Sequence, residues 1–552
     1  MYMTEPVNVV IALDKNYQDM AKVMLKSLCC YQRNLAIFVL SNEDLDETFK
    51  GELTYYLKDK IIDIKFFQMT VPDNFKSHDY ISPATYLRYA IEDLFEYGYS
   101  DYWLYLDCDI LVVRNILEPF TWAEFQDYAL AAVPDVYVKQ MKHHVQKFGE
   151  DDYFNAGVLY INAKQWKNKD YKQRFINKTL LYAEELKFAD QDVFNLAFKQ
   201  QWLKLPLQYN VQSDAQSGLP NKQAAVLHFT GSKKPYGLDI EQNPNYPNLQ
   251  RYQHYQQKTW SDVLKTKSVA VVTSTIGRAE LERAIESVQQ QSYPCKHYVF
   301  VDGEQYFDKV KPLQTKYPEV IFTFLPMNTG ADGWTNSSIN AIAPFLVQEE
   351  IICYLDDDNW YDNDHVQNIV DGFNSYENVG VVYNLRRFVM EDGQYLCNDN
   401  TESLGFWGFR QINYSFKFNQ ITADLYSFMH RQGHVDTNCL AMTLQTAQAL
   451  AHYWVQSKLN DYMVFKQCQL QNKTIVSTGQ RTVNYVLNIK NNEYTNLFDT
   501  FKVEESQKVD FIYQMFAEKN NQVLQQIPEM VDWFKTTVFV DGELVCLSET
   551  VG

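Results

Sequence analysis

Two stretches of the chain combine an apolar run of strand length with closely spaced carboxylates. Tyr102–Val113 carries Asp107 and Asp109 near its middle, and Ile351–Asp358 ends in three consecutive aspartates. An unpaired charge inside a buried strand is costly, so such acids are expected at the carboxyl end of a strand, where they can share a divalent cation. Period-two geometry points Asp107 and Asp109 to the same side of the strand. The pattern therefore predicts an acidic site in each half of the chain.

The apolar pattern around these stretches predicts alternating strands and helices. Val7–Leu13 and Leu35–Leu40 are typical of buried strands, and the segment between them repeats apolar residues at helical spacing. This order predicts a parallel sheet with a right-handed crossover. Ligands of such sheets bind beyond the carboxyl ends of the strands, so a nucleotide-sized crevice is expected there. The same order of strand, helix and strand begins again in the second half, with strands predicted in Ser268–Arg278 and His297–Asp302.

Composition narrows the class of protein. At 552 residues the chain is long enough for several domains, and a hydrophobic content of 46% supplies sizeable cores. The net charge of −19 argues against binding to nucleic acid, which relies on basic residues that neutralise phosphates. Nine cysteines without regular spacing are typical of a reduced, cytoplasmic protein. We see no signal peptide and no apolar run long enough to span a membrane, so membrane association is expected only through a partner.

Polar residues at the ends of the predicted strands of the first half supply candidate chemistry. Val226–Tyr236 places His228 at a strand end and follows it with Gly231 and two lysines. A neutral imidazole and two carboxylates form a plausible ligand set for Mn²⁺ or Mg²⁺. A lysine beyond a glycine turn can reach a phosphate whose other oxygens the metal holds.

These motifs, in this order, resemble the retaining glycosyltransferases of family 8 over roughly residues 7–260. The motifs that carry the resemblance are Leu106-Asp-Cys-Asp109, Asp152-Tyr-Phe-Asn-Ala-Gly157, Ala189-Asp-Gln-Asp192 and His228-Phe-Thr-Gly-Ser-Lys-Lys-Pro-Tyr236. The resemblance implies metal binding by Asp107, Asp109 and His228. It implies contacts with the nucleotide, the donor sugar or the diphosphate by Ala12, Asp14, Asn16, Tyr17, Arg88, Asn155, Ala156, Gly157, Gly231 and Lys234. The family usually ends the last motif in Trp, where this chain has Tyr236.

The same resemblance places Asp190 and Gln191 next to the donor sugar, as candidate catalytic residues. Departure of UDP requires neutralisation of its developing charge, which a divalent ion and a lysine supply. Retention of configuration requires either a protein nucleophile or front-face attack assisted by the leaving phosphate. The motif offers only Asp190, Gln191 and Asp192 near the sugar, and Gln191 is a poor nucleophile. We therefore expect front-face attack.

The second half resembles the inverting glycosyltransferases of family 2 over about residues 268–490. The matching parts are Thr273-Ser-Thr-Ile-Gly-Arg278, Val301-Asp-Gly303, Asn328-Thr-Gly330 and the triplet Asp356-Asp-Asp358. The resemblance implies that Thr273 and Asp302 contact the base. It implies that Asp356 and Asp358, with Asp357 as the alternative ligand, hold a metal and the diphosphate. Asp461 occupies the place of the general base that an inverting transfer needs. The family's usual Pro is missing from the first motif, and Thr335 stands where many relatives have Arg.

The sequence thus predicts an α/β protein with two tandem GT-A-type, Rossmann-like domains. Their expected bounds are residues 1–265 and 266–502, and a helical tail with a terminal hairpin follows at 503–552.

The leading hypothesis is a bifunctional, metal-dependent hexosyltransferase that uses UDP-sugars to extend a cell-surface glycan or glycoprotein. A second hypothesis keeps only the first domain catalytic and makes the second an acceptor-binding or docking module. A third hypothesis, a phosphatase of the haloacid dehalogenase type, rests on Leu106-Asp-Cys-Asp109 alone and leaves the motif that begins at His228 unexplained.

Overall fold

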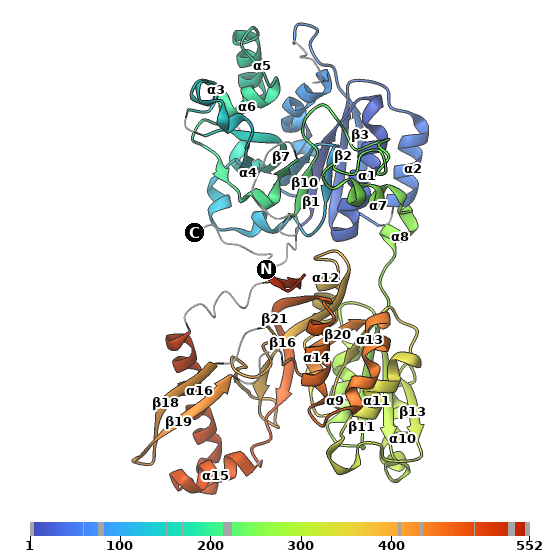
Figure 1. The fold of residues 1–552 in the computed structure, drawn as a ribbon, viewed down its shortest axis with the longest axis vertical. Coiled ribbons are helices and arrows are strands. Elements are labelled where there is room, and N and C mark those ends of the chain that lie inside the picture. Colours follow the sequence, from blue (N-terminus) through green and yellow to red (C-terminus); the bar gives the residue numbers. More distant parts are fainter. Residues whose placement is uncertain are drawn as a thin grey trace. The chain divides into compact units, whose positions relative to one another are not determined.

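The computed structural model describes residues 5–58, 60–75, 82–150, 152–167, 169–213, 224–406, 410–429, 434–490, 492–527 and 536–546. The chain forms two compact units, of which the first extends to Lys265 and the second begins at Thr266. Each unit is described by itself (Figure 1). Within the described residues, no helix is long and apolar enough to cross a membrane.

The first unit is built on a seven-stranded sheet with the order β3-β2-β1-β4-β7-β6-β8. Its strands are β1 (Val7–Ala12), β2 (Leu35–Ser41), β3 (Asp63–Gln68), β4 (Tyr102–Leu106), β6 (Leu130–Pro134), β7 (Phe154–Asn162) and β8 (Leu203–Lys204). The strands β1 to β4 are parallel, as the apolar pattern predicts, and β7 pairs antiparallel with both β4 and β6. The carboxyl ends of β1 and β4 therefore meet at one edge of the sheet.

Helices cover both faces of this sheet. The helices α1 (Gln18–Tyr31), α2 (Glu47–Leu57) and α8 (Trp260–Leu264) pack on the face that carries Val7, Val9 and Ile11. The 3₁₀ helix η2 (Pro83–Tyr97) and the helices α5 (Tyr171–Leu181) and α6 (Asp190–Ala197) pack on the other face. The remaining helices are α3 (Lys142–Phe148), α4 (Ala163–Trp166) and α7 (Leu249–Gln257). A sheet buried on both faces explains why its strands read as continuous apolar runs.

The acidic stretch Tyr102–Val113 is not one strand, which corrects the geometry expected for its carboxylates. Strand β4 ends at Leu106, and β5 (Ile110–Val112) belongs to a separate three-stranded sheet with the order β5-β10-β9. The other two strands of that sheet are β9 (Val211–Gln212) and β10 (Val226–His228). Asp107 and Asp109 thus lie in the turn between two sheets, and not on one side of a continuous strand.

The second unit repeats the parallel start within a larger sheet, whose main order is β13-β12-β11-β14-β20-β16-β21-β22-β23. These strands are β11 (Val269–Thr275), β12 (Lys296–Asp302), β13 (Ile321–Leu325), β14 (Ile351–Tyr354), β16 (Val379–Val389), β20 (Leu440–Thr443), β21 (Thr474–Val486), β22 (Thr537–Val540) and β23 (Glu543–Cys546). The short strands β15 (Trp360–Tyr361) and β17 (Tyr395–Asn398) pair beside this path. The helices are α9 (Leu281–Gln289), α10 (Phe307–Lys316), α11 (Ser337–Ile342), α12 (His365–Phe373), α13 (Leu444–Leu450) and α14 (Asn460–Leu470).

The C-terminal segment packs within the second unit. Helices α15 (Asn492–Phe501) and α16 (Lys508–Gln526) cover the hairpin of β18 (Arg410–Phe418) and β19 (Ile421–Met429) through a shared apolar core. Strand β22 pairs with β21, and the turn between β22 and β23 holds Asp541 and Gly542 at φ of 51° and 80°. A two-residue turn with both φ values positive is the hairpin type that Asp-Gly predicts.

Candidate functional site

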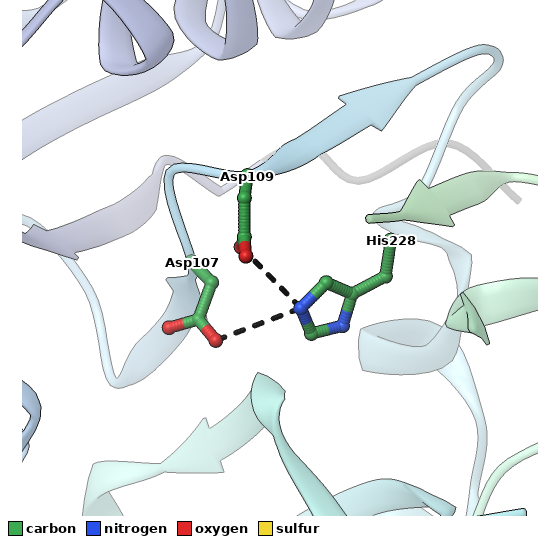
Figure 2. Close-up of side chains that lie close together, drawn as sticks. All are labelled: Asp107, Asp109 and His228. Carbon is green, nitrogen blue, oxygen red and sulfur yellow. Dashed lines mark ion pairs between the residues drawn. The ribbon is translucent and has the colours of Figure 1, made fainter. Parts of the chain in front are cut away.

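Two carboxylates and one imidazole converge at the carboxyl edge of the first sheet. In the β5–β10 ladder, His228 lies opposite Ile110, next to Asp109. The Nε2 atom of His228 is 3.7 Å from Asp107 Oδ2 and 3.3 Å from Asp109 Oδ1 (Figure 2). One ligand atom from each side chain lies within 4.8 Å of the other two. In the described part of the chain, this is the single group of three or more His, Cys, Asp or Glu side chains arranged in this way.

Two cations balance the charge of this triad. Arg88 Nη2 is 2.5 Å from Asp107 Oδ1, and Lys234 Nζ is 2.5 Å from Asp109 Oδ2. Burial opposes ionisation of Asp109, but Lys234 and His228 outweigh it and hold the pKa of that carboxyl below its ordinary value. Burial likewise opposes the charge of Lys234, and Asp109 raises the pKa of the lysine in spite of it. Asp109 is therefore held in the ionised form that a metal ligand requires.

A cavity of about 450 Å³ lies beside the triad, a volume that suits a small-molecule ligand. Of the residues that the sequence assigns to the first site, twelve line it: Ala12, Asp14, Tyr17, Arg88, Asp107, Asp109, Asn155, Asp190, Gln191, His228, Gly231 and Lys234. Asn16 is exposed, and Ala156 and Gly157 lie in β7 without lining the cavity. The structure thus gathers most of the expected side chains from six separate segments of the chain.

The two candidate catalytic residues of α6 have different surroundings. Asp190 is buried and forms an ion pair with Arg88 and a hydrogen bond with Thr85. Burial raises the pKa of Asp190, and Arg88 partly offsets that effect. Gln191 accepts a hydrogen bond from the backbone N–H of Ala156 at 2.9 Å. Its amide is therefore fixed at the wall of the cavity.

Asp135 is a residue of this site that the sequence did not reveal. It follows β6, lines the cavity and is buried. Its Oδ2 accepts hydrogen bonds from Gln191 Nε2 at 3.0 Å and from Asn155 Nδ2 at 3.1 Å. The available signal was an acidic residue directly after a buried apolar strand, the same signal that Asp14 gives after β1.

Gly157 leaves no room for a side chain next to the triad. A Cβ at this position would lie 2.6 Å from Asp107 Oδ2 and would also overlap Cε1 of His228. Gly157→Ala should therefore displace two of the three candidate ligands and weaken Mn²⁺ binding by about tenfold or more. Binding is measured by electron paramagnetic resonance of free Mn²⁺.

The control for this variant is Gly51→Ala in α2, where an added Cβ meets no atom within 4 Å. It should leave Mn²⁺ affinity unchanged. Equal affinities of the Gly157→Ala variant and the parent would contradict the expected crowding.

The acidic triplet of the second unit has its own partners. Asp356 accepts hydrogen bonds from Asn336 Nδ2 at 2.7 Å and Asn438 Nδ2 at 2.8 Å. Asp357 accepts one from Thr275 Oγ1 at 2.6 Å, and Arg278 forms ion pairs with Asp357 and Asp358. Burial and neighbouring carboxylates raise the pKa of Asp356 to about 7, and burial raises that of Asp357 to about 6. Burial therefore opposes ionisation of Asp356 and Asp357, and a bound cation would favour their charged forms.

The residues expected to contact the base in the second unit are turned inward. Thr273 is fully buried in β11, and its hydroxyl lies 2.9 Å from Nε2 of the buried His297. Asp302 accepts three hydrogen bonds, from the N–H and hydroxyl of Thr329 and from the N–H of Gly330. The contacts of Asp302 hold the loop that follows β13.

Asp461 lies in the first turn of α14 and pairs with a histidine. His434 Nε2 is 3.1 Å from Asp461 Oδ2, and the backbone N–H of Tyr462 donates to Asp461 Oδ1 at 2.7 Å. Burial lowers the pKa of His434, but the bond to Asp461 outweighs it and raises that pKa above its ordinary value. The pairing of His434 with Asp461 thus stabilises the second unit below about pH 6.5. This stabilisation is lost as pH rises through the raised pKa of His434.

Asp461→Asn should lower the pKa of His434 below its ordinary value of 6.5, because burial then acts on the imidazolium without the opposing carboxylate. The pKa is read from an NMR titration of the His434 Cε1–H signal, assigned by its loss in His434→Gln. An unchanged pKa would show that Asp461 does not control this histidine.

Each half of the chain matches a known protein family. Residues 8–237 match the model of Glycosyl transferase family 8, and residues 268–435 match that of Glycosyl transferase family 2. The chain carries a family 8 domain followed by a family 2 domain, which confirms both resemblances noted in the sequence.

Curated relatives include other glycosyltransferases. Glycosyltransferase GlyD of Streptococcus pneumoniae serotype 4 (strain ATCC BAA-334 / TIGR4) is 28% identical over 57% of this chain and 36% of its own length. Lipopolysaccharide 1,2-glucosyltransferase of Escherichia coli is 28% identical over 48% of this chain and 82% of its own length. The crystal structure of galactosyltransferase LgtC with donor and acceptor sugar analogues is 26% identical, covers 45% of this chain and 95% of the other, and has a TM-score of 0.40. The chain thus spans about a third of the length of GlyD.

Proposed function

We propose that the chain is a bifunctional glycosyltransferase that uses UDP-sugars, with a retaining, metal-dependent hexosyltransferase in the first unit and an inverting transferase in the second. The observation that carries the first assignment is the triad of Asp107, Asp109 and His228 at the wall of the 450 Å³ cavity, flanked by Arg88 and Lys234.

The donor set of the triad fits Mn²⁺ or Mg²⁺, since one oxygen from each of two carboxylates and one imidazole nitrogen lie close together. Asp107, Asp109 and His228 would hold the metal, which would supply positive charge opposite the diphosphate. Lys234 lies on the same side and would contact a phosphate oxygen once the metal replaces it as the partner of Asp109. Both features favour departure of UDP.

The surroundings of α6 support front-face attack for the retaining reaction. Asp190 is engaged by Arg88, and Asp192 is enclosed by His144, Tyr153 and the backbone N–H groups of Lys187 and Phe188. Neither carboxylate is free to act as a nucleophile. Gln191 would orient the donor sugar through its fixed amide, and the leaving phosphate would accept the proton of the acceptor hydroxyl.

In the second unit, Asp356 and Asp358 would hold a metal near the diphosphate, with Asp357 as the alternative ligand, and Asp461 would act as the general base. The three adjacent carboxylates follow β14 with Arg278 beside two of them, and this arrangement supports the assignment. Thr273 and Asp302 would then have to release their present partners to reach a base.

A second candidate function keeps catalysis in the first unit alone and assigns acceptor binding to the second. The hydrogen bonds from Asn336 and Asn438 to the two oxygens of Asp356 favour it, because they compete with a metal for the same lone pairs.

The acceptor would be a glycan or a glycoprotein of the cell surface, and membrane contact would come through a partner. None of the nine cysteines, all of which lie in the described part of the chain, forms a disulfide, which supports a cytoplasmic setting.

The test is a UDP-release screen of the full chain against a panel of UDP-sugars, with Mn²⁺ and with EDTA. Asp107→Asn and Asp358→Asn are assayed beside the parent. Bifunctionality requires that each substitution remove a different transfer step. If Asp358→Asn leaves every step intact, the second candidate function replaces it; if neither substitution affects any step, both assignments are overturned.

A further inference from the structure

A chain of buried amide side chains connects the candidate metal ligand His228 with the sugar side of the cavity. Asn210 follows the 3₁₀ turn Leu207–Tyr209, directly before β9, and is 1% exposed. Its two side-chain atoms lie 3.0 Å from His228 Nδ1 and 2.9 Å from Asn155 Oδ1. It is absent from the residues that line the cavity, so its effect would be indirect.

The direction of each hydrogen bond in this chain follows from one backbone group. The N–H of Gly157 can only donate, and it donates to Asn155 Oδ1 at 3.0 Å. That oxygen also faces Asn210, so Asn210 presents its NH₂ group there and its carbonyl oxygen to His228. A carbonyl oxygen can only accept, and His228 Nδ1 must therefore carry a proton.

This tautomer leaves the lone pair of His228 on Nε2, the atom that faces Asp107 and Asp109. An imidazole that ligates a metal is commonly fixed in this way by a hydrogen bond at its other nitrogen. At the far end, Asn155 Nδ2 donates to Asp135, which also accepts from Gln191. Asn210 is thus bonded to both sides of the site.

We propose that Asn210 is a positioning residue that holds His228 in the metal-binding tautomer and, through Asn155, fixes the donor-sugar wall of the cavity. This inference rests on the proposed function of the first unit. It predicts that loss of Asn210 weakens two separate properties, metal affinity and discrimination between UDP-sugar and UDP.

The experiment compares Asn210→Ala with Asn210→Asp in the full chain. Both are placed in an Asp358→Asn background, so that Mn²⁺ binding reports the first unit. In Asn210→Ala, His228 loses its acceptor, and Mn²⁺ affinity should fall about 10- to 100-fold. In Asn210→Asp, a carboxylate still accepts from His228 Nδ1–H, so Mn²⁺ affinity should be kept, while the donor toward Asn155 is lost.

The second measurement is the ratio of dissociation constants for UDP and UDP-sugar at saturating Mn²⁺. Both variants should lower this ratio toward one. Asn8→Ala is the matched control, because Asn8 is equally buried in β1 and bonds Ser100 and Tyr102 at the opposite end of the sheet. It should lower thermal stability without changing Mn²⁺ affinity or the ratio.

Equal Mn²⁺ affinities of Asn210→Ala and its parent would overturn the inference, as would a fall of the same size in Asn8→Ala. If Asn210→Ala does not fold, the inference stands or falls on Asn210→Asp, which must keep Mn²⁺ affinity and lose discrimination. A parent that neither binds Mn²⁺ nor releases UDP from any UDP-sugar would overturn the proposed function and this inference together.

Discussion

Asp109→Asn is expected to lower the Mn²⁺ affinity of the first unit at least about 10²-fold and to slow its sugar transfer by a similar factor, as loss of a single preorganised electrostatic group does at other sites. Asp109 is buried, and it faces both His228 and Lys234. An amide in its place removes one charged ligand and leaves Lys234 without the carboxylate that offsets its burial. Mn²⁺ binding is measured in the Asp358→Asn background, and transfer by UDP release.

Asp101→Asn is the matched control. Asp101 directly precedes β4, whereas Asp109 lies in the turn that follows it. Asp101 pairs with Lys167 at 3.1 Å, and both side chains are about half exposed. This substitution should change neither affinity nor rate. An unchanged Mn²⁺ affinity of Asp109→Asn would show that the triad is not the metal site.

Arg88→Met is expected to give the largest loss of stability in the first unit, about 3–5 kcal/mol, since it leaves a buried carboxylate without its cation. Arg88 pairs with Asp190, which is 1% exposed, and with Asp107, and it stacks on Tyr105 at 4.7 Å from the ring centroid. The free energy of opening is measured by hydrogen exchange of peptides from β4, which isolates the first unit.

The double variant Arg88→Met/Asp190→Asn separates the charge from the packing. Removal of both partners should recover about 2 kcal/mol relative to Arg88→Met, because the charge of the buried Asp190 is then gone, whereas the more exposed Asp107 still lacks its cation. A double variant no more stable than Arg88→Met would show that the loss comes from side-chain packing alone.

Much of the fold could be predicted from short sequence patterns, each within a single helix or hairpin. Helix α9 buries Leu281, Ala284, Ile285 and Val288, which recur at helical spacing between the two predicted strands that open the second half. Asp541-Gly542 predicted the terminal hairpin because a tight turn depends on only a few neighbouring residues. Each signal lies within one element, so no distant part of the chain had to be known.

The candidate site depends more on long-range pairing. The convergence of Asp107 and Asp109 was expected from one continuous strand, whereas the structure achieves it through a turn between two sheets. The third residue of the triad, His228, was predicted from its place at the start of a motif that resembles family 8. Its physical cause is the register of β10 on β5, which no local pattern encodes.

Polar residues at strand ends show why a role is hard to predict from the sequence. Asp135, Thr273 and Asp302 all lie at or near the carboxyl ends of strands, where a polar residue can face a ligand or bond to the protein. Asp135 faces the cavity, whereas Asp302 holds the Thr329–Gly330 backbone. The role of each residue depends on the group that it faces or bonds, and that group is distant in sequence.

The β5–β10 ladder has a consequence for how the first unit folds. Asp109 and Lys234 are 125 residues apart in sequence, so their contact closes nearly half of the unit into one loop. The entropy of that closure opposes folding and is recovered only when the ladder forms. A metal bound by Asp107, Asp109 and His228 would bind the native chain alone and would stabilise it by mass action. During synthesis, a chain that has not yet reached His228 would hold the acidic pair without the ligand that completes the set, so transferase activity would begin only once the whole unit has folded.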